Sequence, residues 1–147
     1  MAYQEKEPFK ITIMQFLKNT DQSLEKLYDL TMVTKMCRGN QDHILKLVEV
    51  FITQISQSVE QIWVGYNERD LVRIENVIHK IKPTLTYFDT DKIKLELLLI
   101  EALVANELWT IELKEKIASL DAVVKRTVDK MEEDFCINNN NNNNNNK

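Results

Sequence analysis

His79 and Lys82 are the residues of this chain whose types and spacing could support chemistry. They lie three positions apart in the stretch ENVIHKIKPTLTYF (Glu75–Phe88), which otherwise has the apolar spacing of a helix. Residues three apart lie on one helix face. A neutral imidazole is a nucleophile, and an ammonium one turn further on could stabilise an anion held there. Lys80 lies further round the helix, and we expect it to be a solvated charge.

Pro83 follows His79 by four residues and lacks the N–H that a helix interior uses. Its ring crowds the His79 carbonyl, and a proline inside a helix costs about 3 kcal/mol. One interpretation ends the helix near Ile81. Leu85 and Phe88 nevertheless continue the apolar spacing in phase. We therefore expect a continuous helix with a kink at or just before Pro83.

The phase of the apolar stripe gives the direction in which His79 points. At about 100° per residue, His79 projects roughly 130° away from the mean direction of the stripe. The sequence therefore predicts a histidine on the surface rather than one packed in the core. The apolar positions that set this direction are Leu71, Ile74, Ile78, Ile81, Leu85 and Phe88.

Three further stretches have the same spacing, which is typical of amphipathic helices. The stripes are Ile44, Val48, Phe51, Ile55, Val59, Ile62 and Tyr66; Ile93, Leu97, Ile100 and Val104; and Leu113, Ile117, Leu120, Val124, Val128, Met131 and Phe135. Asn40 and Asp70 are suitable N-caps. Short connections make consecutive helices antiparallel. We predict an all-α, antiparallel up-down four-helix bundle, with the short helix Thr31–Cys37 before it.

The chain of 147 residues suits a single domain. We expect the bundle over residues 24–136 and an N-terminal extension over 1–23. The spacing of its apolar stretch (9–19) fits either a strand or a helix, and in a helical bundle we favour a helix packing on one end. Residues 137–147 are expected to be a low-complexity asparagine tail.

Composition argues against several classes of function. The net charge is −4 and no basic stripe is visible, so nucleic-acid binding is not expected. Two glycines cannot build a nucleotide-binding loop. No apolar run approaches the roughly 20 residues of a membrane span, and no signal peptide is visible. Cys37 and Cys136 have no ligand or CxxC spacing, so we expect reduced thiols in a cytoplasmic protein.

The residues around His79 resemble the histidine-phosphotransfer domain of multistep phosphorelays. That family's motif is H-x-x-K followed by a small residue, usually glycine, on the second helix of a four-helix bundle. The motif here is formed by His79, Lys80, Ile81, Lys82 and Pro83. The stretch LYDLTMVTKMCRGNQDHILKLVEVFITQ (Leu27–Gln54) is also similar to the start of the family's domain. The resemblance extends from Leu24 to Phe135.

The resemblance implies a phosphoryl carrier without kinase activity of its own. Nε2 of His79 would take a phosphoryl group from the aspartate of one receiver domain and pass it to the aspartate of another. Lys82 would offset the phosphate charge. The partners would be receiver domains of response regulators or hybrid sensor kinases. The receiver would bring Mg²⁺, and the chain itself would need no cofactor.

Two positions depart from the family's pattern. Pro83 replaces the small residue and is bulkier, although it also exposes the His79 carbonyl. Asp89 stands where the family often has another glycine, and we interpret it as a helix cap. Both departures bear on the choice of partner more than on the nucleophile. The expected docking residues are Glu75, Asn76, Pro83 and Thr86.

Two other functions remain open from the sequence. A helical adaptor would bind protein partners through apolar residues such as Met32 and Met36, although methionines of this kind are more often part of a core. A metal-binding bundle would need several inward-facing glutamate and histidine pairs. The chain offers only Glu75 four residues before an outward-facing His79. His43, in the first turn of its helix, is expected at the surface, where it could border a docking site.

Overall fold

The computed structural model describes residues 26–107 and 109–137, which are helical with no strand among them. Its helices are α2 (Thr31–Met36), α3 (Gln41–Asn67), α4 (Leu71–Tyr87), α5 (Asp91–Ala105) and α6 (Ile111–Phe135). The predicted N-terminal extension and residues 138–147 of the predicted tail lie outside the described residues. Within the described part of the chain, none of the helices combines the length and the apolar character needed to cross a membrane.

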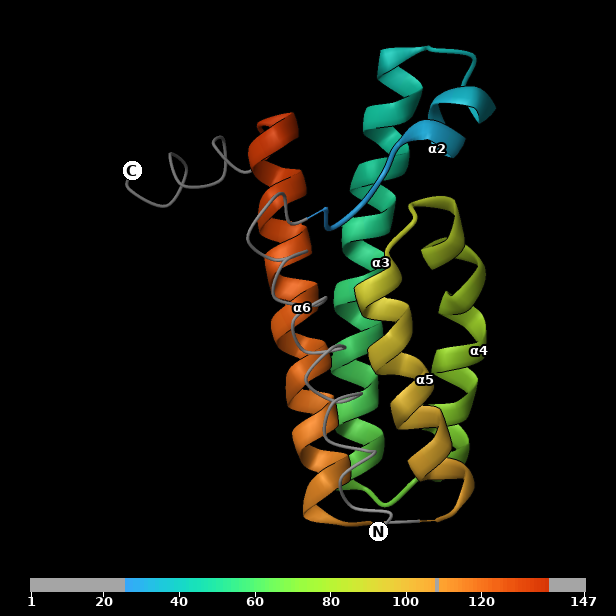
Figure 1. Ribbon diagram of the computed structural model, residues 1–147, viewed down its shortest axis with the longest axis vertical. Helices are drawn as coiled ribbons and strands as arrows, with labels where there is room; N and C mark the ends of the chain where they lie inside the picture. Colours follow the sequence, from blue (N-terminus) through green and yellow to red (C-terminus); the bar gives the residue numbers. More distant parts are fainter. Residues whose placement is uncertain (1–25, 108, 138–147) are drawn as a thin grey trace, which may run out of the picture.

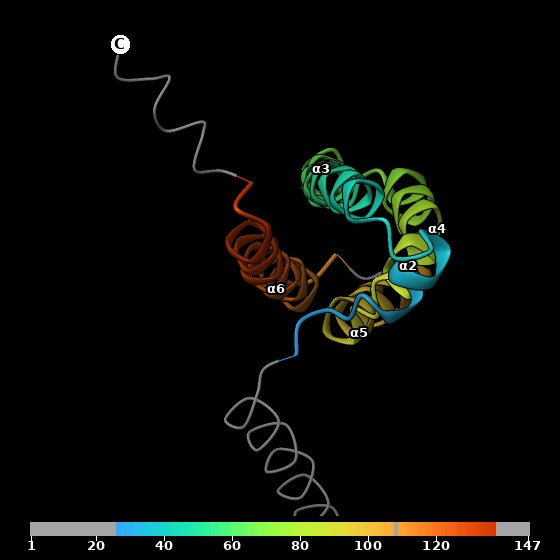
Figure 2. The ribbon, with the colours of Figure 1, turned by 90° about the horizontal axis from the view of Figure 1, so that it is seen from above.

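The four long helices pack side by side around a shared core. Each packs on the next in the chain, and α6 returns to pack on α3. Seen from above, α3, α4, α5 and α6 surround one axis, and α2 lies across an end (Figure 2). Turns of three residues join α3 to α4 and α4 to α5, so neighbouring helices run in opposite directions (Figure 1).

Side-chain caps fix where three of these helices begin. Asn40 accepts a hydrogen bond from the His43 N–H, and Asp70 accepts one from the Arg73 N–H. Thr110 caps α6 in the same way. A capping side chain satisfies one of the backbone donors that the first turn leaves without a partner. The predicted caps Asn40 and Asp70 are thus confirmed.

The buried core follows the 3–4 spacing of the sequence. Every predicted stripe position on α5 is buried, and on α3 only Tyr66 is half-buried. On α6 the buried positions keep the regular 4–3 spacing as far as Met131, so Thr127 is buried where Val128 was predicted. Thr127 satisfies its hydroxyl by donating to the Val123 carbonyl at 2.9 Å. The core positions of the helix that carries His79 are Ile74, Ile78, Ile81 and Leu85.

The turn between α3 and α4 depends on Gly65. A Cβ at this position would lie 2.7 Å from Ile74 Cγ1 and 3.2 Å from the Asp70 carbonyl oxygen. Glycine therefore allows the end of α3 to approach the start of α4 more closely than any other residue would. This contact sets the spacing of the two helices on one side of the candidate site.

The helix that carries His79 runs unbroken through Pro83. The alternative in which the helix ends near Ile81 is wrong, because α4 continues to Tyr87. The buried side chain of Leu85 supplies the reason, since it anchors the turn after the proline in the core. The predicted kink is not decided by these observations and stays a prediction.

The interpretation of Asp89 as a helix cap holds at the C-terminus of α4, where this residue follows the C-cap Phe88 and its backbone N–H donates to the Thr86 carbonyl at 3.2 Å. The φ of Asp89 is 51°, so it adopts the left-handed conformation just after α4 ends. Thr90, buried, occupies the N-cap position of α5 and uses its hydroxyl to donate to the Leu85 carbonyl at 3.1 Å. Left-handed conformation favours glycine, although aspartate tolerates it better than most residues. The backbone at position 89 therefore has the left-handed conformation that glycine adopts most easily.

Candidate functional site around His79

His79 lies exposed on α4, directly after the fully buried Ile78. The predicted outward direction of the histidine is therefore confirmed. Because α4 is anchored through its core face, the backbone that carries the imidazole is held firmly while the ring is open to solvent. A nucleophile that must meet another protein needs both properties.

Lys82, one turn after His79, forms an ion pair with Glu101 on α5. The Lys82 ammonium lies 2.5 Å from Glu101 Oε2, and the two side chains are 35% and 32% exposed. This carboxylate oxygen is buried and has no other hydrogen-bond partner within residues 26–107 and 109–137. The ammonium is therefore its compensating charge. The sequence predicted the face on which Lys82 lies but not this partner.

Pro83 is exposed and follows directly after Lys82. Without an N–H, it cannot donate to the His79 carbonyl four residues earlier. In the next turn, Thr86 Oγ1 donates to the Lys82 carbonyl at 3.4 Å. The backbone of this turn thus leaves one carbonyl beside the imidazole without its helical donor.

A groove between α4 and α5 begins beside Lys82. It has a volume of about 290 Å³. Two lysines and the edge of the leucine-rich α5 give it a mixed cationic and apolar lining. The residues that line it are Lys82, Pro83, Leu85, Thr86, Lys94, Leu97 and Leu98. Leu98 is 53% exposed, so an apolar surface continues outward from this groove.

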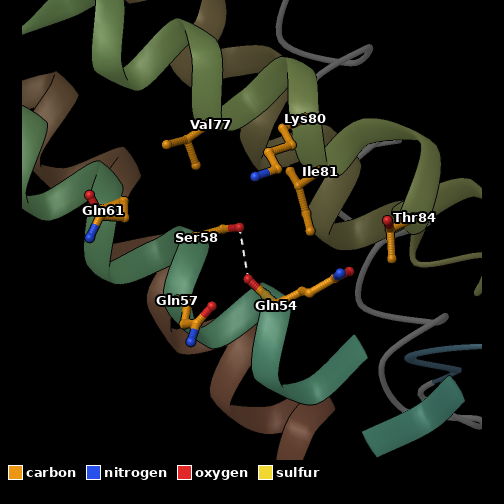
Figure 3. A pocket seen from close by; sticks show the side chains of 8 residues that line it. All are labelled: Gln54, Gln57, Ser58, Gln61, Val77, Lys80, Ile81 and Thr84. Carbon is orange, nitrogen blue, oxygen red and sulfur yellow. Dashed lines mark hydrogen bonds between the residues drawn. The ribbon is translucent and has the colours of Figure 1, made fainter. Parts of the chain in front are cut away.

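A second groove runs along the other side of α4, against α3, and its volume is about 350 Å³. Figure 3 shows Lys80 and Ile81 of α4 above Gln54 and Ser58 of α3. The Ser58 hydroxyl donates to the Gln54 carbonyl at 2.8 Å. Uncharged amide and hydroxyl groups dominate the lining: Gln54, Gln57, Ser58, Gln61, Val77, Lys80, Ile81 and Thr84. Lys80 and Lys82 thus border different grooves, although only two positions separate them.

A third groove lies where α2 meets the end of α4. Its lining includes Met32, Thr86 and Tyr87, with the carboxylates of Asp29 and Asp89, and its volume is about 390 Å³. Met32 is 45% exposed and Met36 is 54% exposed. The expectation that such methionines belong to the core is therefore wrong here. Helix α2 has six residues and buries only Val33, so most of its side chains face solvent.

The structure brings together some of the predicted docking residues and not others. Pro83 and Thr86 are exposed and both line the groove between α4 and α5. Thr86 also lines the groove at α2, so it connects the two. Asn76 is exposed and Glu75 is half-buried, and neither lines one of these three grooves. Whether a partner docks on any of them stays a prediction.

Residues 26–29 are held by polar contacts that do not involve His79. The Tyr28 hydroxyl donates to Asp134 on α6, which lowers the pKa of that carboxyl, while burial and the same bond raise the pKa of Tyr28. Lys26 lies 2.5 Å from the Asp29 carboxylate, which also accepts from the Thr31 N–H at 2.7 Å. These contacts hold the pKa of Asp29 well below its usual range. They tie this segment to α2 and α6.

No cluster of three or more histidine, cysteine or acidic side chains within residues 26–107 and 109–137 could hold a metal ion. His43 is exposed in the first turn of α3, as predicted. Both cysteines are free, with Cys37 half-buried and Cys136 exposed. His79 and Lys82 thus lie together on α4, which borders three of the grooves described above.

Comparison of the chain with protein-family models, with curated proteins and with solved structures found no match. The function of the site must therefore be argued from its own residues.

Proposed function

We propose that the chain is a phosphorelay intermediate in which His79 accepts a phosphoryl group from a receiver-domain aspartate and passes it to another receiver. The observation that carries this proposal is the exposed imidazole of His79 with Lys82 one turn on and Pro83 beside it, on a helix anchored through its opposite face. The packing of α3 to α6 is compatible with the four-helix bundle of the histidine-phosphotransfer family. Residues 24–136 would be that domain.

The proposed step transfers a phosphoryl group between two side chains. The Nε2 lone pair of neutral His79 attacks phosphorus, the bond between phosphorus and the donor carboxylate oxygen breaks, and the carboxylate leaves with the electron pair. The Nδ1 proton stays on the ring, which becomes a phosphorylated imidazolium until it loses that proton to water. The reverse sequence loads the next receiver. The receiver's Mg²⁺ would neutralise the phosphoryl oxygens during transfer, so the chain acts as a carrier and not as a kinase.

The surface beside His79 supports docking of a protein partner. The grooves on either side of α4 offer apolar contact at Pro83 and Leu98 and amide groups at Gln57 and Gln61. Interfaces combine such apolar contact with polar groups that fix orientation. The proposed partners are receiver domains of response regulators or hybrid sensor kinases, and the proposed location is the cytoplasm.

The test is transfer from a phosphorylated receiver in the presence of Mg²⁺. We expect acid-labile phosphate on the wild-type chain and none on His79→Gln. His43→Gln is the matched control, because His43 is also an exposed histidine in a helix. The carrier proposal fails if His79→Gln accepts phosphate as well as the wild type does.

A helical adaptor is the second candidate, and the exposure of Met32, Met36 and Tyr87 near one groove favours it. An adaptor would bind its partner without chemistry at His79. Partner binding that survives His79→Gln but is lost in Met32→Ser, with no phosphate found on either protein, would select this alternative.

A further inference from the structure

The ion pair between Lys82 and Glu101 joins α4 to α5 beside the candidate nucleophile. Both side chains are about two-thirds covered, and the paired carboxylate oxygen is itself buried with no other hydrogen-bond partner in the described part of the chain. A carboxylate in this setting depends on its cation, because removing one partner leaves an incompletely solvated charge. Glu101 therefore holds the Lys82 ammonium toward α5.

A phosphoryl group on His79 would compete with Glu101 for the same ammonium. Residues three apart on a helix have Cβ atoms roughly 5–6 Å apart, so the long side chain of Lys82 can reach a group on the imidazole. The ammonium cannot give its full charge to both anions. If it moves toward the phosphoryl oxygens, the Glu101 carboxylate loses its counter-charge and also repels the new anion.

We propose that Glu101 is a positioning residue that acts through Lys82 and limits how strongly the phosphoryl group is held on His79. This inference rests on the proposed function. A carrier must release its phosphoryl group, and a free ammonium beside the imidazole would stabilise the phosphorylated form. Glu101 already pairs with Lys82 before His79 is phosphorylated, so the phosphorylated form gains less from the ammonium. The phosphorylated form is therefore less stable, which favours onward transfer.

The chain offers a matched control on the same helix. Glu96 is, like Glu101, a half-buried glutamate of α5 with one buried carboxylate oxygen, and this Glu96 oxygen has no hydrogen-bond partner among the described residues. Five residues separate the two, which places them about 140° apart around the helix. Glu96 does not line the groove that contains Lys82. Glu96→Gln therefore reproduces the loss of a half-buried charge without releasing Lys82.

The experiment uses the full chain phosphorylated chemically with phosphoramidate, which needs no receiver. The half-life of phosphohistidine is measured in wild type, Glu101→Gln, Glu96→Gln, Lys82→Gln and the Lys82→Gln/Glu101→Gln double variant. We expect Glu101→Gln to lengthen the half-life by about two- to five-fold, the range given by a partly exposed ion pair. Glu96→Gln should match the wild type. Circular dichroism checks that every variant is helical.

The double variant separates action through Lys82 from a general effect of charge. If Glu101 acts through the ammonium, the change of residue 101 has no effect once Lys82 is glutamine. The inference alone fails if His79 is labelled but its phosphohistidine has the same half-life in wild type and Glu101→Gln. It also fails if Glu101→Gln still lengthens the half-life when Lys82 is glutamine. Chemical labelling of His79 without transfer from any receiver overturns the proposed function alone. A wild-type His79 that phosphoramidate cannot label overturns both.

Discussion

The two flanks of α4 differ in chemistry, although they belong to one helix. The flank against α5 places Lys82 in a half-buried ion pair beside the exposed His79, and its groove continues onto leucines. The flank against α3 carries Lys80 among glutamine and hydroxyl side chains. Only the ammonium on the α5 side is paired with a carboxylate of the neighbouring helix, whereas Lys80 borders neutral groups. The α3 side offers neutral hydrogen-bonding groups, which suit contact with a protein surface better than chemistry.

The buried face of α4 holds both flanks in place. A substitution in this face should therefore have the largest effect on the free energy of unfolding. Ile78→Ala removes a fully buried side chain and should lower the free energy of unfolding by roughly 2–5 kcal/mol. His79→Ala, at the exposed neighbouring position, should change it by about 0.5 kcal/mol or less. Urea denaturation followed by circular dichroism measures both. Similar losses for the two variants would show that His79 contributes to the core, and the flanks would then lose their distinction.

The comparison of the two lysines tests the flanks directly. Lys82→Gln should slow phosphoryl transfer to His79 at least about tenfold, since a hydrogen bond to a charged group contributes roughly 1.5–3 kcal/mol. Lys80→Gln removes the same charge from the other flank and should change the rate less than about twofold at physiological salt. Rapid-quench measurements with one purified receiver compare the two. Equal effects would mean that net charge, and not the position of Lys82, supports the reaction.

A substitution far from both flanks of α4 should change the stability of the protein without changing phosphoryl transfer. Tyr28→Phe removes the donor to Asp134 and should lower the free energy of unfolding by about 1 kcal/mol at neutral pH, with no effect on transfer. The hydrogen bond lowers the pKa of Asp134 below its ordinary value of 3.8, so its contribution is present above that value and is lost as the pH falls. The raised pKa of Tyr28 gives the opposite dependence: its contribution is lost as the pH rises above 10.

The difference in stability between wild type and Tyr28→Phe should therefore be largest between about pH 5 and 9 and shrink on either side. Urea denaturation from about pH 3 to about pH 11 measures it, because the changes are expected on either side of the plateau. A difference that stays constant with pH would show that the Tyr28 ring, and not its hydroxyl, holds residues 26–29 to α6.

The sequence predicts the parts of the fold that depend on local spacing. The 3–4 stripe of α4 determines that Ile78 faces inward and His79 outward, and Asn40 and Asp70 determine where two helices begin. These features need only the periodicity of a helix and the hydrogen bonding of its first turn. The continuity of α4 through Pro83 was predictable for the same reason, because Leu85 continues the stripe.

Features that depend on contact between helices were not predictable in this way. Helix α5 has leucines on nearly every side, so its sequence gives no sign that Glu101 faces Lys82. Thr127 is buried in place of Val128 because the packed face of α6 keeps its regular 4–3 spacing, although the sequence offers an apolar residue one position later. Met32 and Met36 are exposed because α2 is too short to bury more than one side.

The central claim is that His79 is the residue that carries the phosphoryl group. Its most direct test is mass spectrometry, at neutral or alkaline pH, of the chain after brief incubation with a phosphorylated receiver and Mg²⁺. We predict a single phosphoryl group on the peptide that contains His79, which disappears when a second, unphosphorylated receiver is added. A phosphoryl group on His43 or on any other residue, or a group on His79 that no receiver can remove, would contradict this claim.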